Sequence, residues 1–245
     1  MSTIGNWRGP NIIKDGLFLY LNPNSPNSFY DTTSTIIKDI SGNGNNTTLI
    51  NGPTYNSNNG GNIVFDGTND YLNTNIGLKP TSTTIEVVCS IISNTSIKTG
   101  GNTVAQYIVF RQNTRTSNFE GVVLNYIQSG LSGYFNINMA SSGGLTKTAS
   151  TPLINLNQIY SVTATYNSTN LTIYLNGQFV SQTSTGFPID YNLVHTYKLG
   201  RADAIGQTFD GYLNGKIYDV RFYDRTLTSS EILQNYNATK SRFGL

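Results

Sequence analysis

The sequence predicts an all-β protein: an antiparallel β-sandwich of the jelly-roll kind with one short C-terminal helix. Many short segments alternate apolar and polar residues with a period of two. Gly, Asn and Ser separate these segments, as expected for turns. Neither a composition break nor an internal repeat divides the chain, so we expect one domain at residues 15–245, preceded by an N-terminal arm at residues 1–14.

The expected strands follow one another along most of the chain. They lie at residues 16–22, 47–50, 62–67, 70–74, 83–92, 105–112, 121–127, 133–140, 159–167, 171–183, 196–202 and 211–225. In one of them Leu171, Ile173 and Leu175 alternate with polar residues, as in a half-buried strand of an antiparallel sheet. The dipeptide Asn176–Gly177 predicts a type I′ turn that folds this segment into a hairpin.

One helix is expected, near the C-terminus. Thr228 stands three residues before Glu231, the spacing of a capping box. Ile232, Leu233 and Tyr236 then share one face of the helix.

The composition is that of a β protein with a neutral, hydrogen-bonding surface. Charged residues make up only 11% of the chain, against roughly 25% in average soluble proteins, while Asn alone accounts for 32 residues. The net charge of +2 is dispersed, which excludes a basic stripe for nucleic acid. The sequence starts without a signal peptide and shows no membrane span. We therefore expect a protein that is made in the cytosol, stays there unless it leaves as part of an assembly, and does not insert into a membrane. The single Cys89 is expected to be a buried thiol.

The segment "KDISGNGNNTT" leaves two interpretations open. Asp39, Ser41, Asn43 and Asn45 carry oxygen at every second position, with glycines between them, as in a calcium loop. The same residue types are also common turn formers.

Two further acidic segments are candidate Ca²⁺ ligands. Asp66 and Asp70 alternate with Thr68 in "FDGTNDY", and Asp219 stands inside the otherwise apolar "KIYDVRFY". A buried Asp must be paired or ligated, and Arg221 on the same strand face offers a partner other than a metal.

Several segments carry a resemblance to a known family. These are "DGLFLYLN", "DISGNGNNTTLINGPTY", "IVFDGTNDYLNT", "YSVTATYNSTNLTIYLNGQFV" and the ending "FDGYLNGKIYDVRFYDRTLTSSEILQNYNATKSRFGL". Together they resemble the concanavalin A-like lectin/glucanase superfamily, in particular its laminin G-like modules. The family usually has Trp before the strand at 159–167, where this chain has Gln158–Ile159–Tyr160.

The resemblance brings enzymes and binding modules into consideration. Glycan-cleaving members need two carboxyl groups flanking the bond. Here Glu86 and Glu120 each stand alone, and Glu231 is explained by the helix cap. His195, which a lyase would need, has no motif around it. We therefore expect a protein that is not an enzyme.

The likeness is greatest to laminin G-like domains of tailed-phage virion structural proteins. It implies a virion structural or decoration protein that contacts capsid or tail proteins, forms a homo-oligomer and binds host-surface glycans. A carbohydrate-binding module outside any virion is the alternative. Tyrosines expected on polar strand faces are the candidate glycan ligands: Tyr126, Tyr134 and Tyr174. In the arm, Trp7 beside Arg8 is the candidate interface anchor.

Overall fold

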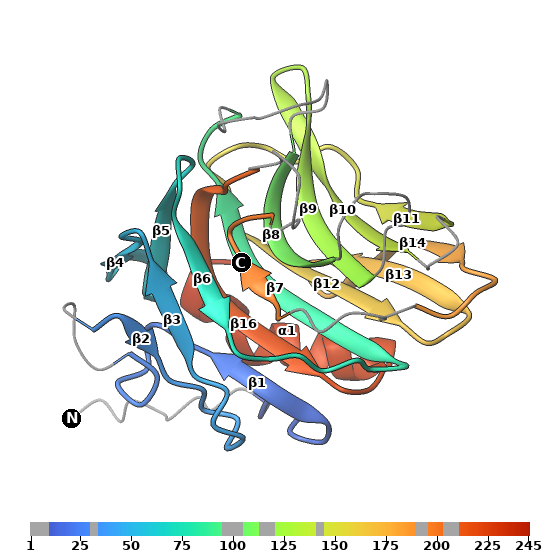
Figure 1. Ribbon diagram of the computed structural model, residues 1–245, viewed down its shortest axis with the longest axis horizontal. Coiled ribbons are helices and arrows are strands. Elements are labelled where there is room, and N and C mark those ends of the chain that lie inside the picture. The colour runs from blue at the N-terminus through green and yellow to red at the C-terminus, as the bar shows by residue number, and fades with distance from the viewer. Residues whose placement is uncertain are drawn as a thin grey trace, which may run out of the picture.

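The computed structural model describes residues 10–29, 34–94, 105–112, 121–140, 145–189, 196–202 and 211–245. These residues form two antiparallel sheets packed face to face, which confirms the predicted β-sandwich. One α-helix, α1, follows the last strand, as expected. Figure 1 shows the two layers, with α1 behind the rear sheet.

Sheet A has β16 and β7 near its centre. Its strands, in spatial order, are β14 (Gln178–Ser184), β13 (Asn170–Leu175), β12 (Tyr160–Tyr166), β7 (Thr83–Ile91), β16 (Asn214–Tyr223), β5 (Asn62–Asp66) and β4 (Thr54–Asn56). β1 (Leu17–Leu21) also pairs with β16, beyond the end of β5. The C-terminal strand therefore lies inside the sheet and not at its edge.

Sheet B forms the front layer. Its order is β11 (Thr146–Ser150), β10 (Ser132–Ala140), β9 (Gly121–Ser129), β8 (Ala105–Gln112), β15 (Lys198–Leu199), β6 (Tyr71–Thr74), β3 (Thr47–Ile50) and β2 (Ile36–Ile37). The edge strands of the two sheets are joined by side chains, because Ser181 and Thr183 of β14 donate to the carbonyls of Ser150 and Thr148 of β11. This joint covers an edge that would otherwise be open to pairing.

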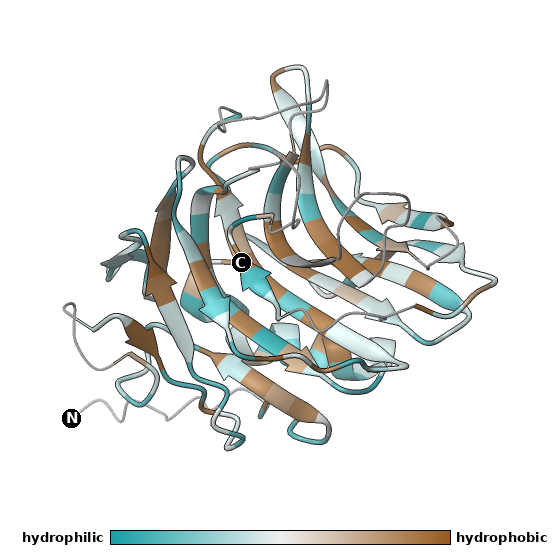
Figure 2. Ribbon diagram, viewed as in Figure 1, coloured by the Kyte–Doolittle hydropathy of each residue, from teal (hydrophilic) through white to brown (hydrophobic). Residues whose placement is uncertain are grey.

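The main core lies between the sheets. Alternate residues of nearly every strand enter it, as Figure 2 suggests from the alternation of hydrophobic and hydrophilic segments. Leu171 and Ile173 of β13 point into this core, as predicted. Cys89 is buried there as well, with no exposed surface, and its burial raises the pKa of the thiol to about 12.

The centre of the outer face of sheet A is also buried. This corrects the expectation of a half-buried strand at residues 171–175, because Thr172 and Tyr174 of β13 are buried as well. All residues of β7 and β12 are buried, including polar ones such as Glu86 and Thr163. The reason is α1 (Ser229–Phe243), which lies against this sheet and buries Ile232, Asn235, Thr239 and Phe243. Each central strand of sheet A is thus covered on two sides.

Turn and cap chemistry follow the sequence closely. Asn176 and Gly177 have φ of 51° and 74°, the positive values that a type I′ turn requires. Thr228 and Glu231 form both hydrogen bonds of the capping box. The helix continues to Phe243, well beyond Tyr236, and ends at Gly244 in the left-handed conformation.

Three strands were not predicted from the sequence: the short strands β2 and β4 and the edge strand β11. A 3₁₀ turn, η1 (Asn58–Gly60), precedes β5.

Candidate functional site

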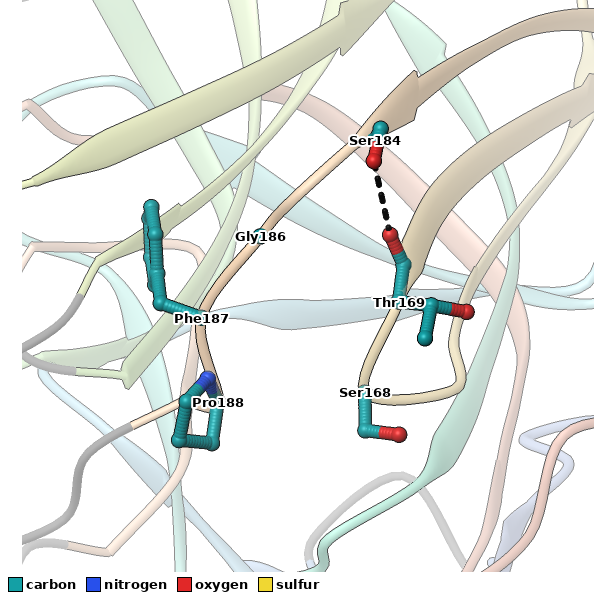
Figure 3. A pocket seen from close by; sticks show the side chains of 6 residues that line it. All are labelled: Ser168, Thr169, Ser184, Gly186, Phe187 and Pro188. Carbon is teal, nitrogen blue, oxygen red and sulfur yellow. Dashed lines mark hydrogen bonds between the residues drawn. The ribbon is translucent and has the colours of Figure 1, made fainter.

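A pocket of about 330 Å³ opens at the end of the sandwich where β13 begins and β14 ends. It is lined by Ser168, Thr169, Ser184, Gly186, Phe187 and Pro188. In Figure 3 the rings of Phe187 and Pro188 lie on the side opposite Ser168 and Thr169. The described part of the lining therefore combines hydroxyl groups with apolar rings, and none of these six side chains is ionisable.

One wall is the tight turn between β12 and β13. Asn167 Oδ1 accepts hydrogen bonds from the backbone N–H of Asn170 at 2.8 Å and from Thr169 Oγ1 at 3.0 Å. This arrangement holds Ser168 at φ 66°, a conformation that Asn and Gly adopt more readily than Ser. The side chains of Ser168 and Thr169 are exposed.

The other wall is residues 185–189, which we call the strap. The backbone N–H of Thr185 donates to Thr169 O at 2.8 Å, and Thr185 Oγ1 donates to Ser168 O at 3.2 Å. Further along, Tyr166 Oη accepts from the N–H of Ile189 at 3.0 Å. Burial raises the pKa of Tyr166, so its phenol stays neutral. The strap is therefore fixed at one end to the facing turn and at the other to Tyr166 at the end of β12.

The predicted calcium loop is a hydrogen-bonded turn in the structure. Asp39 accepts four hydrogen bonds, from the N–H groups of Tyr20, Ser41 and Asn45 and from the Ser41 hydroxyl. The side-chain amides of Asn43 and Asn45 donate to the carbonyls of Leu17 and Phe18 in β1. The loop thus fastens to β1 through its own side chains, and calcium binding here stays a prediction.

Asp66 and Asp70 lie at either end of the turn between β5 and β6. Asp66 Oδ1 accepts from the N–H of Thr68 at 2.7 Å, and Asp70 Oδ2 accepts from the N–H of Asp66 at 3.2 Å. Asp66 is exposed, whereas Asp70 is 5% exposed. Desolvation and the nearby charge of Asp66 raise the pKa of Asp70 to about 6. A bound cation would favour the ionised form of Asp70, and calcium binding by this pair stays a prediction.

Asp219 is buried beneath α1 and is paired with arginines. Arg221 Nε lies 3.1 Å from Asp219 Oδ1, and Arg242 Nη2 lies 2.9 Å from Oδ2. The Arg221 contact is an ion pair without hydrogen-bond alignment, while Arg242 donates a hydrogen bond. Two guanidinium groups repel a cation, so the geometry favours the ion-pair alternative over a calcium ligand. In the described part of the chain, no three acidic, His or Cys side chains gather as a metal site.

The candidate glycan tyrosines do not form one site. Tyr126 is fully buried in the main core, where its hydroxyl donates to Asn94 Oδ1 at 2.7 Å. Tyr174 is 7% exposed and contacts Ser229 at the start of α1. Tyr134 is the one of the three that is partly exposed, on the opposite sheet. The predicted polar-face position was wrong for Tyr126, whose ring enters the main core. Tyr174 does lie on the face opposite Leu171 and Ile173, but there it is covered by the start of the helix.

Trp7 and Arg8 lie outside the described residues, as do Glu120 and His195. The C-terminal part of the arm does have partners on α1. The N–H of Ile13 donates to Asn235 Oδ1 at 2.8 Å, and Gln234 Nε2 donates to Asn11 O at 2.7 Å. No described helix is both long and apolar enough to cross a membrane.

The sequence analysis did not single out the pocket residues. Both walls consist of turn-forming residues, "NSTN" and "STGFP", which appear as ordinary punctuation between strands. The feature that marks this wall of the pocket is the positive φ of Ser168, beside Asn167, whose side chain accepts hydrogen bonds from its own turn. The sequence alone does not show this backbone conformation.

Two antiparallel sheets packed face to face, with a helix against the outer face of one of them, define the class as a β-sandwich. A family model described as "Concanavalin A-like lectin/glucanases superfamily" matches residues 66–233. The chain belongs to this superfamily, within its Laminin_G_3 family, which confirms the concanavalin A-like jelly roll.

Solved structures show the same fold. The binding domain of botulinum neurotoxin DC in complex with SialylT matches with a TM-score of 0.67 and 15% identity, over 92% of this chain and 52% of that one. The binding domain of Paraclostridial Mosquitocidal Protein 1 matches with a TM-score of 0.65 and 17% identity, over the same shares. The chain therefore spans about half the length of these structures. No curated protein matches it by sequence.

Proposed function

We propose that the protein is a non-enzymatic, lectin-like domain that binds glycans. The observation that carries this proposal is the end pocket, whose two walls hold hydroxyl groups and apolar rings in fixed positions, with no charged side chain among its described residues. Concave sites that combine apolar surface with a few placed polar groups are typical of small-molecule ligands. The similar toxin structures are binding domains as well, which supports a binding role.

The surroundings of two glutamates support a role without catalysis. Glu86 is 3% exposed and lies beneath α1, 3.2 Å from Arg221 Nε. Glu231 is held by the capping box and by both Nη atoms of Arg225. Each carboxylate thus has a structural partner and neither faces the pocket. Release of reducing ends from common polysaccharides above a blank without protein would contradict this part of the proposal.

A glycan array tests the binding role directly. We expect the purified protein to bind a defined subset of immobilised glycans above the level of a heat-denatured sample. Equal signal over all glycans, or none at all, would contradict the proposal.

For the biological setting we propose an exposed structural or decoration protein of a phage particle. The neutral, Asn-rich composition and the resemblance of the C-terminal segment to virion proteins support this setting. The alternative is a carbohydrate-binding module that belongs to no virion. Mass spectrometry of purified virions separates the two, because a decoration protein is present at a fixed copy number and a free module is absent.

A further inference from the structure

The residues that the structure describes around the end pocket are all neutral. Its polar atoms are the hydroxyls of Ser168, Thr169 and Ser184 and the backbone of these two segments. Each of these hydroxyls donates inside the protein, Ser168 Oγ to Asn167 O, Thr169 Oγ1 to Asn167 Oδ1 and Ser184 Oγ to Thr169 O. Toward a ligand they can therefore only accept a hydrogen bond, which favours a ligand that carries O–H donors over an anion. A ligand with many hydroxyl groups and no charge fits this lining.

The size of the pocket sets a limit on the ligand. About 330 Å³ is near the lower end of the roughly 300–1,000 Å³ range of small-molecule sites. The two walls also differ in composition, with Ser168 and Thr169 on one side and the rings of Phe187 and Pro188 on the other (Figure 3). A single sugar ring has both properties, an apolar C–H face and an edge of hydroxyl groups.

The pocket is shaped before any ligand arrives. The strap is tied to the turn by Thr185 and to the core by Tyr166, and Phe187 packs partly against the main core. Gly186, at φ 69°, would have no atom within 4 Å of an added Cβ, so the mouth is open beside it. A site that needs little ordering on binding loses less conformational entropy.

We infer that this pocket takes one uncharged sugar ring at the end of a glycan chain, with its C–H face against Pro188 and Phe187 and its hydroxyls toward Ser168, Thr169 and Ser184. The inference rests on the proposed function, and it adds the class of sugar and the pocket in which the sugar binds. It predicts that binding depends on terminal neutral hexoses and not on sialic acid or sulfate.

The test uses the full chain and three variants on one strand. Ser184→Tyr places a ring in the pocket, and Ser184→Ala removes one hydroxyl. Gln178→Tyr adds the same ring at an exposed position at the other end of β14 and is the matched control. Each protein is applied to an array of glycans that end in neutral, sialylated or sulfated sugars, and its melting curve confirms folding.

We expect wild type and Gln178→Tyr to bind the same glycans with neutral ends, and Ser184→Tyr to bind at least about tenfold more weakly, a difference of about 1.4 kcal/mol. Ser184→Ala should give an intermediate loss. Raising the salt from about 0.05 to about 0.5 M should leave the affinity unchanged, since no charge pair is screened.

Three results would overturn the inference. Binding confined to sialylated or sulfated ends would refute the ligand class, and equal binding by Ser184→Tyr and wild type would refute the place. In both cases the proposed glycan binding would stand. Absence of binding to every glycan would overturn the proposed function and the inference together.

Discussion

Asn235 of α1 donates a hydrogen bond from Nδ2 to Oε2 of Glu86 in β7, at 2.9 Å, with both side chains almost fully buried. The same amide nitrogen also donates to Tyr223 Oη at 2.9 Å, and its oxygen accepts from the N–H of Ile13. One asparagine thus joins the helix, the centre of sheet A and the N-terminal arm. The helix is held by polar contacts as much as by apolar ones, because Asn235 and Thr239 are two of its four buried residues.

Replacing Asn235 should therefore destabilise the fold. In Asn235→Ala, Glu86 and the N–H of Ile13 lose a buried partner, and we expect the free energy of unfolding to fall by about 2 kcal/mol. Asn237→Ala makes the same chemical change on the same helix at a partly exposed position and should shift it by less than about 0.5 kcal/mol. Urea unfolding of both variants measures the difference. Equal effects would show that the Asn235 contacts add nothing beyond helix propensity.

Asp70 makes stability depend on pH. Its pKa is raised to about 6 by burial and by Asp66, so the folded state holds the proton more tightly than the unfolded chain. The stability from this group is present at acid pH and is lost as the pH rises from about 4 through 6.

Asp70→Asn keeps an acceptor for the N–H of Asp66 and removes the charge. We expect it to be more stable than wild type at pH 8 by about 3 kcal/mol and to equal it near pH 4. Thermal melting across this pH range is the measurement, with Asp66→Asn as the exposed neighbour for comparison. A difference that does not change with pH would remove Asp70 as its source.

Much of the fold can be predicted from the sequence, because local chemistry determines its parts. Period-two alternation locates most of the longer strands, Asn176–Gly177 fixes one hairpin, and Thr228 with Glu231 fixes the start of the helix. β2, β4 and β11 were missed because they are short or carry no apolar alternation.

The site residues are harder to predict, for a geometric reason. Alternation separates the two faces of a strand but does not tell which face is covered. The sequence predicts Tyr126 and Tyr174 on polar strand faces. In the structure Tyr126 enters the main core, and Tyr174 lies beside α1. The pocket combines residues from two separate connections, so no single stretch of sequence shows it.

Calcium is testable through the same acidic pair. A cation bound by Asp66 and Asp70 stabilises the native state by RT ln(1 + [L]/Kd), about 2.7 kcal/mol at 100 Kd. We expect millimolar calcium to raise the melting temperature of wild type and to leave Asp70→Asn unchanged. If Asp70→Asn responds as wild type does, the ion lies elsewhere, with the Asp39 loop next to be tested by Asp39→Asn. Melting curves that superimpose in chelator and in calcium would eliminate calcium altogether.

The two ends of the N-terminal arm are expected to have different roles. Asn11 and Ile13 bond to Gln234 and Asn235 of α1, and Tyr223 Oη donates to Ile13 O at 3.1 Å. Removing residues 1–14 deletes all three contacts and should lower the melting temperature. Removing residues 1–9 keeps them and deletes Trp7 and Arg8, residue types that are enriched at interface anchors.

Comparison of the two truncations therefore separates folding from docking. If Trp7 and Arg8 dock on another subunit, the protein lacking residues 1–9 melts like wild type, but light scattering shows that it no longer assembles. If they dock on a virion shell, the same protein melts like wild type but no longer attaches to particles. Trp7→Ala should reproduce that loss, and Ile12→Ala, within the described arm, is its matched control. A lower melting temperature without residues 1–9, at unchanged mass and attachment, would mean instead that Trp7 covers its own sandwich. In that case the anchor proposed for the arm is wrong, and any partner must bind elsewhere.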